Sequence, residues 1–128
     1  MYYTPASTAG SQHFLIVEPD PLFRLLVCIA LAGESSDFHA VACLDEALAL
    51  LAEREFSAVI AEYHLPGGTG MSLYEHARRV SAHMPFILMC GGDRITLPDR
   101  HFRFFAKPFG LSEFADSLAE MIAGSRGA

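Results

Sequence analysis

Residues 15–24 read LIVEPDPLFR, and this stretch decides the fold. Its first three residues form a short apolar run that suits a buried strand. The residues after Pro21 have a helical period instead, and two acids lie between the two patterns. A strand that passes directly into a helix is the first half of a β-α-β unit, so the segment predicts an α/β domain.

The same alternation continues along the chain. Apolar runs that suit strands occupy residues 14–17, 38–41, 58–61, 86–89 and 102–105. Helical patterns start after Pro21, near Asp45, near Thr69 and near Leu111. This alternation predicts five parallel strands with right-handed crossovers and helices on both faces of the sheet, which is a three-layer α/β domain.

The connection between the fourth and fifth strands is too short for a full helix. The residues between Cys90 and Lys107 must supply a strand and two loops as well. Gly91, Gly92 and Pro98 shorten the helix further, because proline inside a helix removes a hydrogen bond and clashes with the preceding turn. We expect a shortened fourth helix, roughly one or two turns long.

Length and composition indicate one folded domain with protein partners. The chain has 128 residues, of which 52% are hydrophobic and 19% charged. We expect the domain over residues 13–123, with a flexible N-terminal tail at 1–12 and a C-terminal tail at 124–128. The net charge of −6 disfavours direct binding to nucleic acid or to an anionic membrane, so proteins are the expected partners.

The sequence also predicts a cytoplasmic location. It has no apolar run long enough for a membrane span and no secretory signal pattern at its start. Cys28, Cys43 and Cys90 are widely spaced and form no C-x-x-C pair, which argues against a disulfide framework and a zinc site. The six histidines have no metal-ligand spacing either.

Reactive side chains are expected at one edge of the sheet, because the carboxyl ends of parallel strands meet there. The first strand ends in Glu18-Pro19-Asp20, the third in Glu62, the fourth in Cys90 and the fifth in Lys107. Carboxylates, a thiol and a lysine at one rim suggest a phosphate or metal site.

Four segments carry a resemblance to a known family. They are residues 15–24, the acid-x-x-Leu-Pro-Gly turn at 62–67, the strand region 85–91 and Lys107-Pro108-Phe109. In this order and spacing they resemble the receiver domain of bacterial two-component response regulators, from Phe14 to about Ile122. The resemblance implies a flavodoxin-like, doubly wound sheet of five parallel strands. It also implies a phosphorelay, in which a histidine kinase passes a phosphoryl group to an aspartate after the third strand.

The reactive positions of that family are altered here. In receivers, acids after the first strand hold Mg²⁺, a Ser or Thr after the fourth binds the phosphoryl group, and a lysine after the fifth neutralises it. Glu62 replaces the phosphoacceptor, and its additional methylene moves the carboxylate by roughly 1.5 Å. Pro19 replaces the second metal-binding acid and Cys90 the hydroxyl. Because only Lys107 and Glu18 remain, we expect no catalytic residue, no cofactor, and no metal or a weakly bound one at Glu18.

These alterations predict a pseudo-receiver that is not an enzyme. Such a domain would signal without phosphorylation, by binding a histidine kinase or a downstream effector. The alternative is a working receiver, in which an atypical Mg²⁺-dependent pocket accepts a phosphoryl group at Glu62 or Asp20. A phosphatase-like hydrolase is disfavoured, because it needs Asp-x-Asp where this chain has Glu18-Pro19-Asp20.

Two interpretations of the pocket stay open. Lys107 could form a structural ion pair with Glu62 or Glu18. Alternatively, Glu62 could project its carboxylate into the phosphoryl volume and hold the domain in an active-like state. Cys90 is expected to be a buried thiol, with a redox sensor activated by Lys107 as the alternative.

The first helix and the shortened fourth helix predict interfaces. At about 100° per residue, one stripe of the first helix is expected to face the sheet, namely Leu22, Leu25, Leu26 and Ile29. Val27, Cys28 and Leu31 would then lie outside, available to a partner or to a second copy in a homodimer. The short fourth helix would expose Phe104, at the family's switch-aromatic position, and Phe109.

Overall fold

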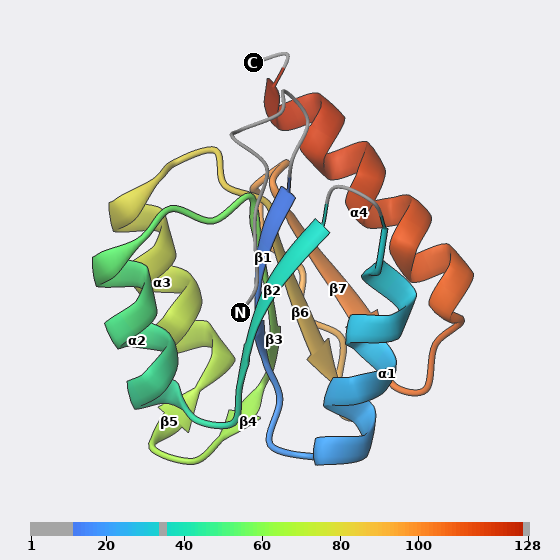
Figure 1. The fold of residues 1–128 in the computed structure, drawn as a ribbon, viewed down its shortest axis with the longest axis horizontal. Coiled ribbons are helices and arrows are strands. Elements are labelled where there is room, and N and C mark those ends of the chain that lie inside the picture. The colour runs from blue at the N-terminus through green and yellow to red at the C-terminus, as the bar shows by residue number, and fades with distance from the viewer. Residues whose placement is uncertain (1–11, 34–35, 127–128) are drawn as a thin grey trace, which may run out of the picture.

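The computed structural model describes residues 12–33 and 36–126 and forms three layers (Figure 1). The central sheet has five parallel strands in the order β2-β1-β3-β6-β7. Its strands are β1 (Gln12–Val17), β2 (Ser36–Val41), β3 (Ala58–Glu62), β6 (Phe86–Cys90) and β7 (Phe102–Ala106). The helices are α1 (Pro21–Leu31), α2 (Leu44–Glu53), α3 (Gly70–Val80) and α4 (Leu111–Arg126). A small antiparallel hairpin of β4 (His64–Leu65) and β5 (Gly68–Thr69) follows β3.

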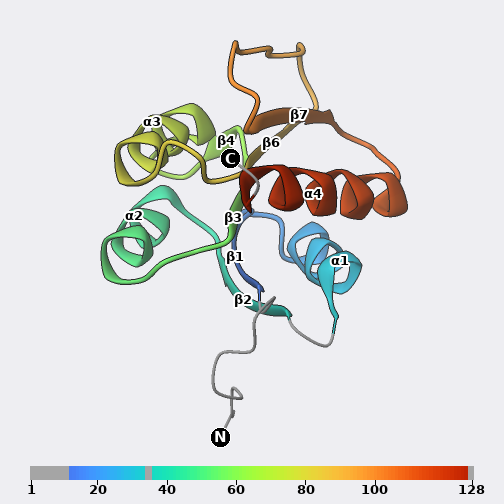
Figure 2. The ribbon, with the colours of Figure 1, turned by 90° about the horizontal axis from the view of Figure 1, so that it is seen from above.

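Helices cover both faces of this sheet, with α2 and α3 on one face and α1 and α4 on the other (Figure 2). The predicted α/β class and all five predicted strands are therefore confirmed, each strand being one or two residues longer than its apolar run. Within the described part of the chain, none of the helices combines the length and the apolar character that a membrane span needs.

The ends of the domain differ from the sequence prediction. Strand β1 begins at Gln12, and α4 continues to Arg126, so residues 124–126 are helical where a tail was expected. The rest of the two predicted tails, residues 1–11 and 127–128, lies outside the described residues.

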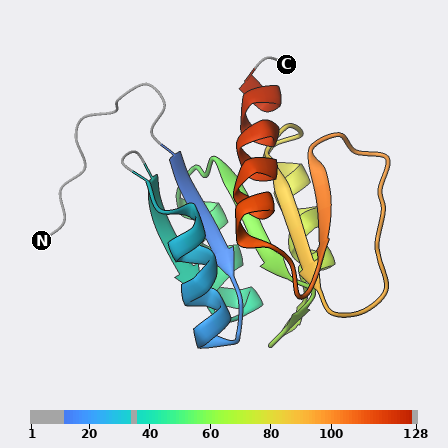
Figure 3. The same ribbon diagram turned by 90° about the vertical axis from the view of Figure 1, so that its right-hand side faces the viewer.

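The expected short fourth helix is replaced by a loop. All of residues 91–101 are described, and none is helical. Figure 3 shows this loop running from β6 to β7 at the side of the sheet. Ile95 and Leu97 pack against the core on the α3 side, and Asp99 accepts hydrogen bonds from Tyr74 and Arg78 of α3. The loop is therefore held by two apolar side chains and one carboxylate instead of by a helix face.

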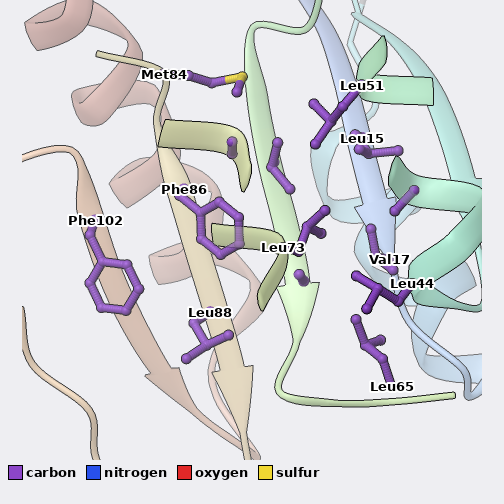
Figure 4. Close-up of a cluster of buried hydrophobic side chains, with 14 of the residues drawn as sticks. Leu15, Val17, Leu44, Leu51, Leu65, Leu73, Met84, Phe86, Leu88 and Phe102 are labelled. Carbon is purple, nitrogen blue, oxygen red and sulfur yellow. The ribbon is translucent and has the colours of Figure 1, made fainter. Parts of the chain in front are cut away.

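Two apolar clusters fill the space on either side of the sheet. Alternate residues of each strand point to opposite faces, so Leu15 and Val17 of β1 belong to the cluster under α2 and α3 (Figure 4). Phe14 and Ile16 belong to the cluster under α1 and α4. Strands β3 and β6 are buried along their whole length, as expected for the middle of a parallel sheet covered on both faces.

Helix α1 is rotated relative to the sequence prediction. Val27 is fully buried and Leu31 is 8% exposed, whereas both were expected on the outer face. The stripe expected to face the sheet is exposed instead: Leu22 at 65%, Leu25 at 55%, Leu26 at 36% and Ile29 at 59%. The prediction failed because α1 has apolar residues around its whole circumference, so its periodicity does not define one buried stripe.

Candidate functional site

The carboxyl ends of β1, β3 and β7 bring Glu18, Glu62 and Lys107 together. The Lys107 Nζ lies 2.7 Å from Glu18 Oε1 and 2.6 Å from Glu62 Oε1. Glu18 is 2% exposed and Glu62 7%, so both carboxylates are removed from water. The sequence left open whether Lys107 pairs with one acid or the other, and the structure shows that it pairs with both.

The remaining carboxylate oxygens are also bound. The backbone N–H of Asp20 donates to Glu18 Oε2 at 3.0 Å, and the backbone N–H of His64 donates to Glu62 Oε2 at 2.7 Å. Each of the two acids therefore uses one oxygen for Lys107 and the other for a nearby backbone amide. Charge-assisted hydrogen bonds of this kind are among the stronger ones in proteins.

Lys107 is held in place from several directions. Its backbone N–H donates to the Cys90 carbonyl at 2.9 Å, and the peptide bond to Pro108 is cis. Its Nζ lies 4.3 Å from the centre of the Phe23 ring, within the range of a cation–π interaction. Burial alone would lower the pKa of Lys107, but the hydrogen bonds to Glu18 and Glu62 outweigh it and raise the pKa above its ordinary value. The lysine is therefore held in its charged form.

Pro19 and Asp20 do not supply oxygens to this cluster. Proline has no side-chain oxygen, and the Asp20 Oδ1 accepts the backbone N–H groups of Leu22 at 3.0 Å and Phe23 at 3.4 Å. Asp20 is thus the N-cap of α1, where a carboxylate satisfies otherwise unpaired amides. Arg24, one turn into the helix, donates from Nη1 to the Glu18 carbonyl at 2.7 Å.

Cys90 is a buried thiol, 4% exposed, as expected. Its Sγ accepts the backbone N–H of Gly92 at 3.2 Å. A cleft of about 220 Å³ lies beside it, lined by Tyr63, His64, Cys90, Gly92, Asp93 and Ile95. This lining contains a carboxylate and no lysine or arginine, which is unfavourable for a phosphoryl group.

The donor set does not fit the Mg²⁺ that the resemblance implies. Mg²⁺ needs near-octahedral oxygen ligands at about 2.0–2.1 Å. At this rim, the oxygens of Glu18 and Glu62 are bound to a cation and to amides, and Asp20 caps a helix. Among residues 12–33 and 36–126, no group of three or more His, Cys, Asp or Glu side chains is arranged to hold a metal ion.

The residues predicted for an interface are largely covered. Besides Val27 and Leu31, Phe104 is only 7% exposed, and the Arg94 guanidinium lies 5.4 Å from the centre of its ring. Phe109 is half-buried, with its ring centre 5.6 Å from that of Phe23. Cys28 is half-buried too, and burial raises the pKa of its thiol. The aliphatic side chains of α1 that are exposed are not those predicted for an interface; they are Leu22, Leu25, Leu26 and Ile29.

Sequence reasoning missed three contributions to the site. The capping role of Asp20 had a signal, because Asp followed by Pro is typical of a helix start. The other two contributions had no signal in the sequence, because they depend on how the elements pack. They are the contact of the Phe23 ring with Lys107 and the hydrogen bond from the His64 backbone N–H to Glu62.

Comparisons with known proteins agree with the resemblance, although no family model matches the chain. The chain is 27% identical over 118 residues to the transcriptional regulatory protein PmrA of Pectobacterium parmentieri, which covers 88% of the chain and 53% of that protein. It is 29% identical over 121 residues to the sensor kinase CckA of Brucella abortus, with 89% of the chain and 13% of the kinase covered. The response regulator protein FleR of Pseudomonas aeruginosa is 29% identical over 115 residues, with coverages of 86% and 24%. The chain thus spans about half of PmrA and smaller parts of the other two.

Solved structures show the same fold. A response regulator receiver protein from Sinorhizobium medicae has a TM-score of 0.83 at 15% identity, and the match covers 92% of this chain and 99% of that one. The signal receiver domain of an HD domain-containing protein from Pseudomonas fluorescens has a TM-score of 0.81 at 21% identity, with coverages of 91% and 98%. A CheY-like receiver domain from Methanospirillum hungatei has a TM-score of 0.78 at 19% identity, with coverages of 91% and 97%. The chain therefore has the flavodoxin-like fold of response-regulator receiver domains and resembles response regulators in sequence, as its four segments predicted.

Proposed function

We propose that this receiver-like domain signals by binding another protein and that its pocket does not run a phosphorylation cycle. The observation that supports this proposal most directly is the bridging position of Lys107 between Glu18 and Glu62. A carboxylate that attacks a phosphoryl group needs a free oxygen, and a metal ion that assists it needs oxygens of its own. Here the oxygens that would serve both purposes are already bound.

Opening the pocket would also be costly. Removal of one partner from a buried ion pair typically costs about 3–5 kcal/mol, because the other charge is left uncompensated. A metal ion that took up the oxygens of Glu18 and Glu62 would have to displace Lys107 from at least one buried acid, and phosphorylation needs that metal ion. The same contacts that stabilise the domain therefore oppose phosphorylation, and we infer that the domain is not an enzyme and needs no cofactor.

The partners that we propose are signalling proteins of a two-component pathway, either a histidine kinase or a downstream effector. The similarity to a transcriptional regulatory protein and to a sensor kinase supports this class of partner. We place the domain in the cytoplasm, because Cys28, Cys43 and Cys90 are free thiols, as is usual in a reducing compartment.

The test is a Mg²⁺ titration with and without beryllofluoride, a phosphoryl mimic, followed by the amide chemical shifts of Glu18, Glu62, Cys90 and Lys107. We expect no saturable shift at these four residues. The matched control is the double variant Pro19→Asp with Glu62→Asp, which restores the receiver-type acids and is expected to shift when both ions are added. Saturable shifts in the unaltered protein that require both ions would instead support a working receiver.

A further inference from the structure

Helix α1 carries a ridge of exposed aliphatic side chains, formed by Leu22, Leu25, Leu26 and Ile29. Their exposed fractions run from 36% to 65%, and in the described part of the chain the other large hydrophobic side chain with comparable exposure is Val80, on α3. Four neighbouring exposed aliphatic residues on one helix are unusual for a monomer, because contiguous apolar patches generally mark interaction sites. We call this surface the α1 ridge.

The α1 ridge is uncharged. Helix α1 contains no acidic residue, and its one basic residue, Arg24, directs its guanidinium to the Glu18 carbonyl. A charged group of a partner would therefore have no ion pair on the ridge. The partner surface that packs against the ridge must be apolar as well.

An apolar groove lies beside the ridge, between the C-terminal half of α1 and α4. The groove has a volume of about 370 Å³, and its apolar lining includes Ala30, Leu31, Leu118, Ala119 and Ile122. Gln12 and Ser36 are the polar residues of its lining, which contains no charged residue. Figure 2 shows α1 and α4 side by side on the same face of the sheet. Ala30 and Leu31, which line the groove, directly follow Ile29 of the ridge in α1, so the groove begins where the ridge ends.

Two acids of α4, Glu113 and Glu120, lie away from this surface. With about 3.6 residues per turn, Ala115, Ala119 and Ile122 share one side of the helix, while the acids Glu113, Asp116 and Glu120 share another. Glu120 forms an ion pair with Arg103 of β7, and Glu113 lines a cleft together with Arg103, so these two acids lie on the β7 side of α4. Among the described residues, neither the ridge nor the lining of the groove contains a charged side chain, on a chain whose net charge is −6.

We propose that this face binds a second copy of the chain, with the α1 ridge of each copy inserted into the α1–α4 groove of the other about a twofold axis. A twofold interface requires a surface that is complementary to itself, and a ridge next to a groove meets that requirement. Two copies of charge −6 repel each other least where both faces are uncharged.

The area agrees with a reversible dimer. From the exposed fractions, the ridge presents on the order of 400 Å² of apolar surface per copy. The two ridges bury on the order of 800 Å² in total and the groove walls add to this area, which is the size of a weak or transient interface. This proposal goes beyond the proposed function and does not depend on it.

Sedimentation velocity over a range of concentrations tests the dimer. We expect the unaltered chain to associate reversibly and Leu25→Glu to weaken association by roughly a hundredfold or more, because a carboxylate would be buried without a partner. Ala119→Lys, in the groove, is expected to do the same. Val80→Glu removes the exposed aliphatic residue of α3 instead, and it is the matched control that should associate as the unaltered chain does. Circular dichroism checks that each variant is folded.

Mixing the two weakened variants tests the arrangement. In a mixed dimer, the Glu at position 25 of one copy enters the groove with the Lys at position 119 of the other, and the second ridge and groove are unaltered. We expect association to recover on mixing, although neither variant associates alone. A monomer at all concentrations, association that survives Leu25→Glu, or no recovery on mixing would each overturn the proposal.

Discussion

At the scale of single residues, Lys107 links the ends of three strands. It contacts two carboxylates that are 2% and 7% exposed, so both acids are largely removed from water. Because the hydrogen bonds raise the pKa of Lys107, this stabilisation is complete below the ordinary lysine value of 10.5. It is lost as the pH rises through the higher value that the folded protein has.

Replacing this lysine should destabilise the domain strongly. We expect Lys107→Met to lower the free energy of unfolding by about 3–5 kcal/mol at neutral pH, because Glu18 and Glu62 would remain buried without a cation. Urea denaturation measures the change. Arg54→Met is the control, since Arg54 is exposed, and we expect it to change stability by about 0.5 kcal/mol or less. A loss of similar size in both variants would show that the two bridging contacts do not stabilise the fold.

The sequence predicted which residues form this site, but it could not predict which of their atoms pair with one another. Glu18, Glu62 and Lys107 each follow an apolar run, and parallel strands bring such positions to one rim. Which oxygen meets which donor depends on side-chain torsions and on the backbone turn at His64. These are outcomes of packing, for which the sequence has no periodic signal.

At the scale of elements, α1 shows the limit of hydrophobic periodicity. A helix with polar residues on one side has one possible buried stripe, but α1 is apolar on every side. Its orientation is set by contacts outside the helix: Asp20 caps its start, Phe23 packs on Phe109, and Val27 lies in the core under α1 and α4. The loop at 91–101 is the opposite case, since its glycines and proline correctly predicted a loss of helix but not its extent.

The orientation of α1 can be tested with one substitution on each side of the helix. We expect Val27→Asp to lower the free energy of unfolding by about 4 kcal/mol or more, because a carboxylate at a fully buried position has no partner. Leu25→Asp, at a position that is 55% exposed, is expected to keep the fold and, at a concentration low enough for the chain to be a monomer, to change stability by about 1 kcal/mol or less. Thermal denaturation followed by circular dichroism compares them. The reverse order of stability would support the orientation that the sequence predicted.

At the scale of the whole molecule, two pairs of histidines join segments of the sheet, one pair between β1 and β2 and the other between the segments that precede β6 and β7. His13 Nε2 and His39 Nδ1 lie 2.7 Å apart, and His83 Nδ1 and His101 Nε2 lie 3.3 Å apart. Burial lowers the pKa of His13, an effect that Asp37 opposes and His39 reinforces. Burial also lowers the pKa of His101. Both rings are therefore harder to protonate in the folded chain than in the unfolded chain.

This difference makes stability depend on pH. Because the unfolded chain binds protons first, the stabilisation is complete above the ordinary histidine value of 6.5 and is lost as the pH falls below it. We expect the free energy of unfolding, measured with urea, to decrease between about pH 7.5 and about pH 5.5. His13→Gln should reduce this decrease in part, since His101 still contributes. His64→Gln, which replaces an exposed ring, is the control, and an equal slope for both variants would contradict the assignment to His13.

The bridging lysine has a consequence for how information could pass through such a domain. A phosphoryl group that is added and later removed records, for a time, that the protein has received a signal. A pocket whose two acids are already paired with its own lysine keeps no such record. On the proposed function, the strength of the signal would follow the number of copies present and their affinity for the partner, by mass action. The level of gene expression would then control the strength of the signal, whereas in a phosphorylated receiver the phosphoryl donor controls it.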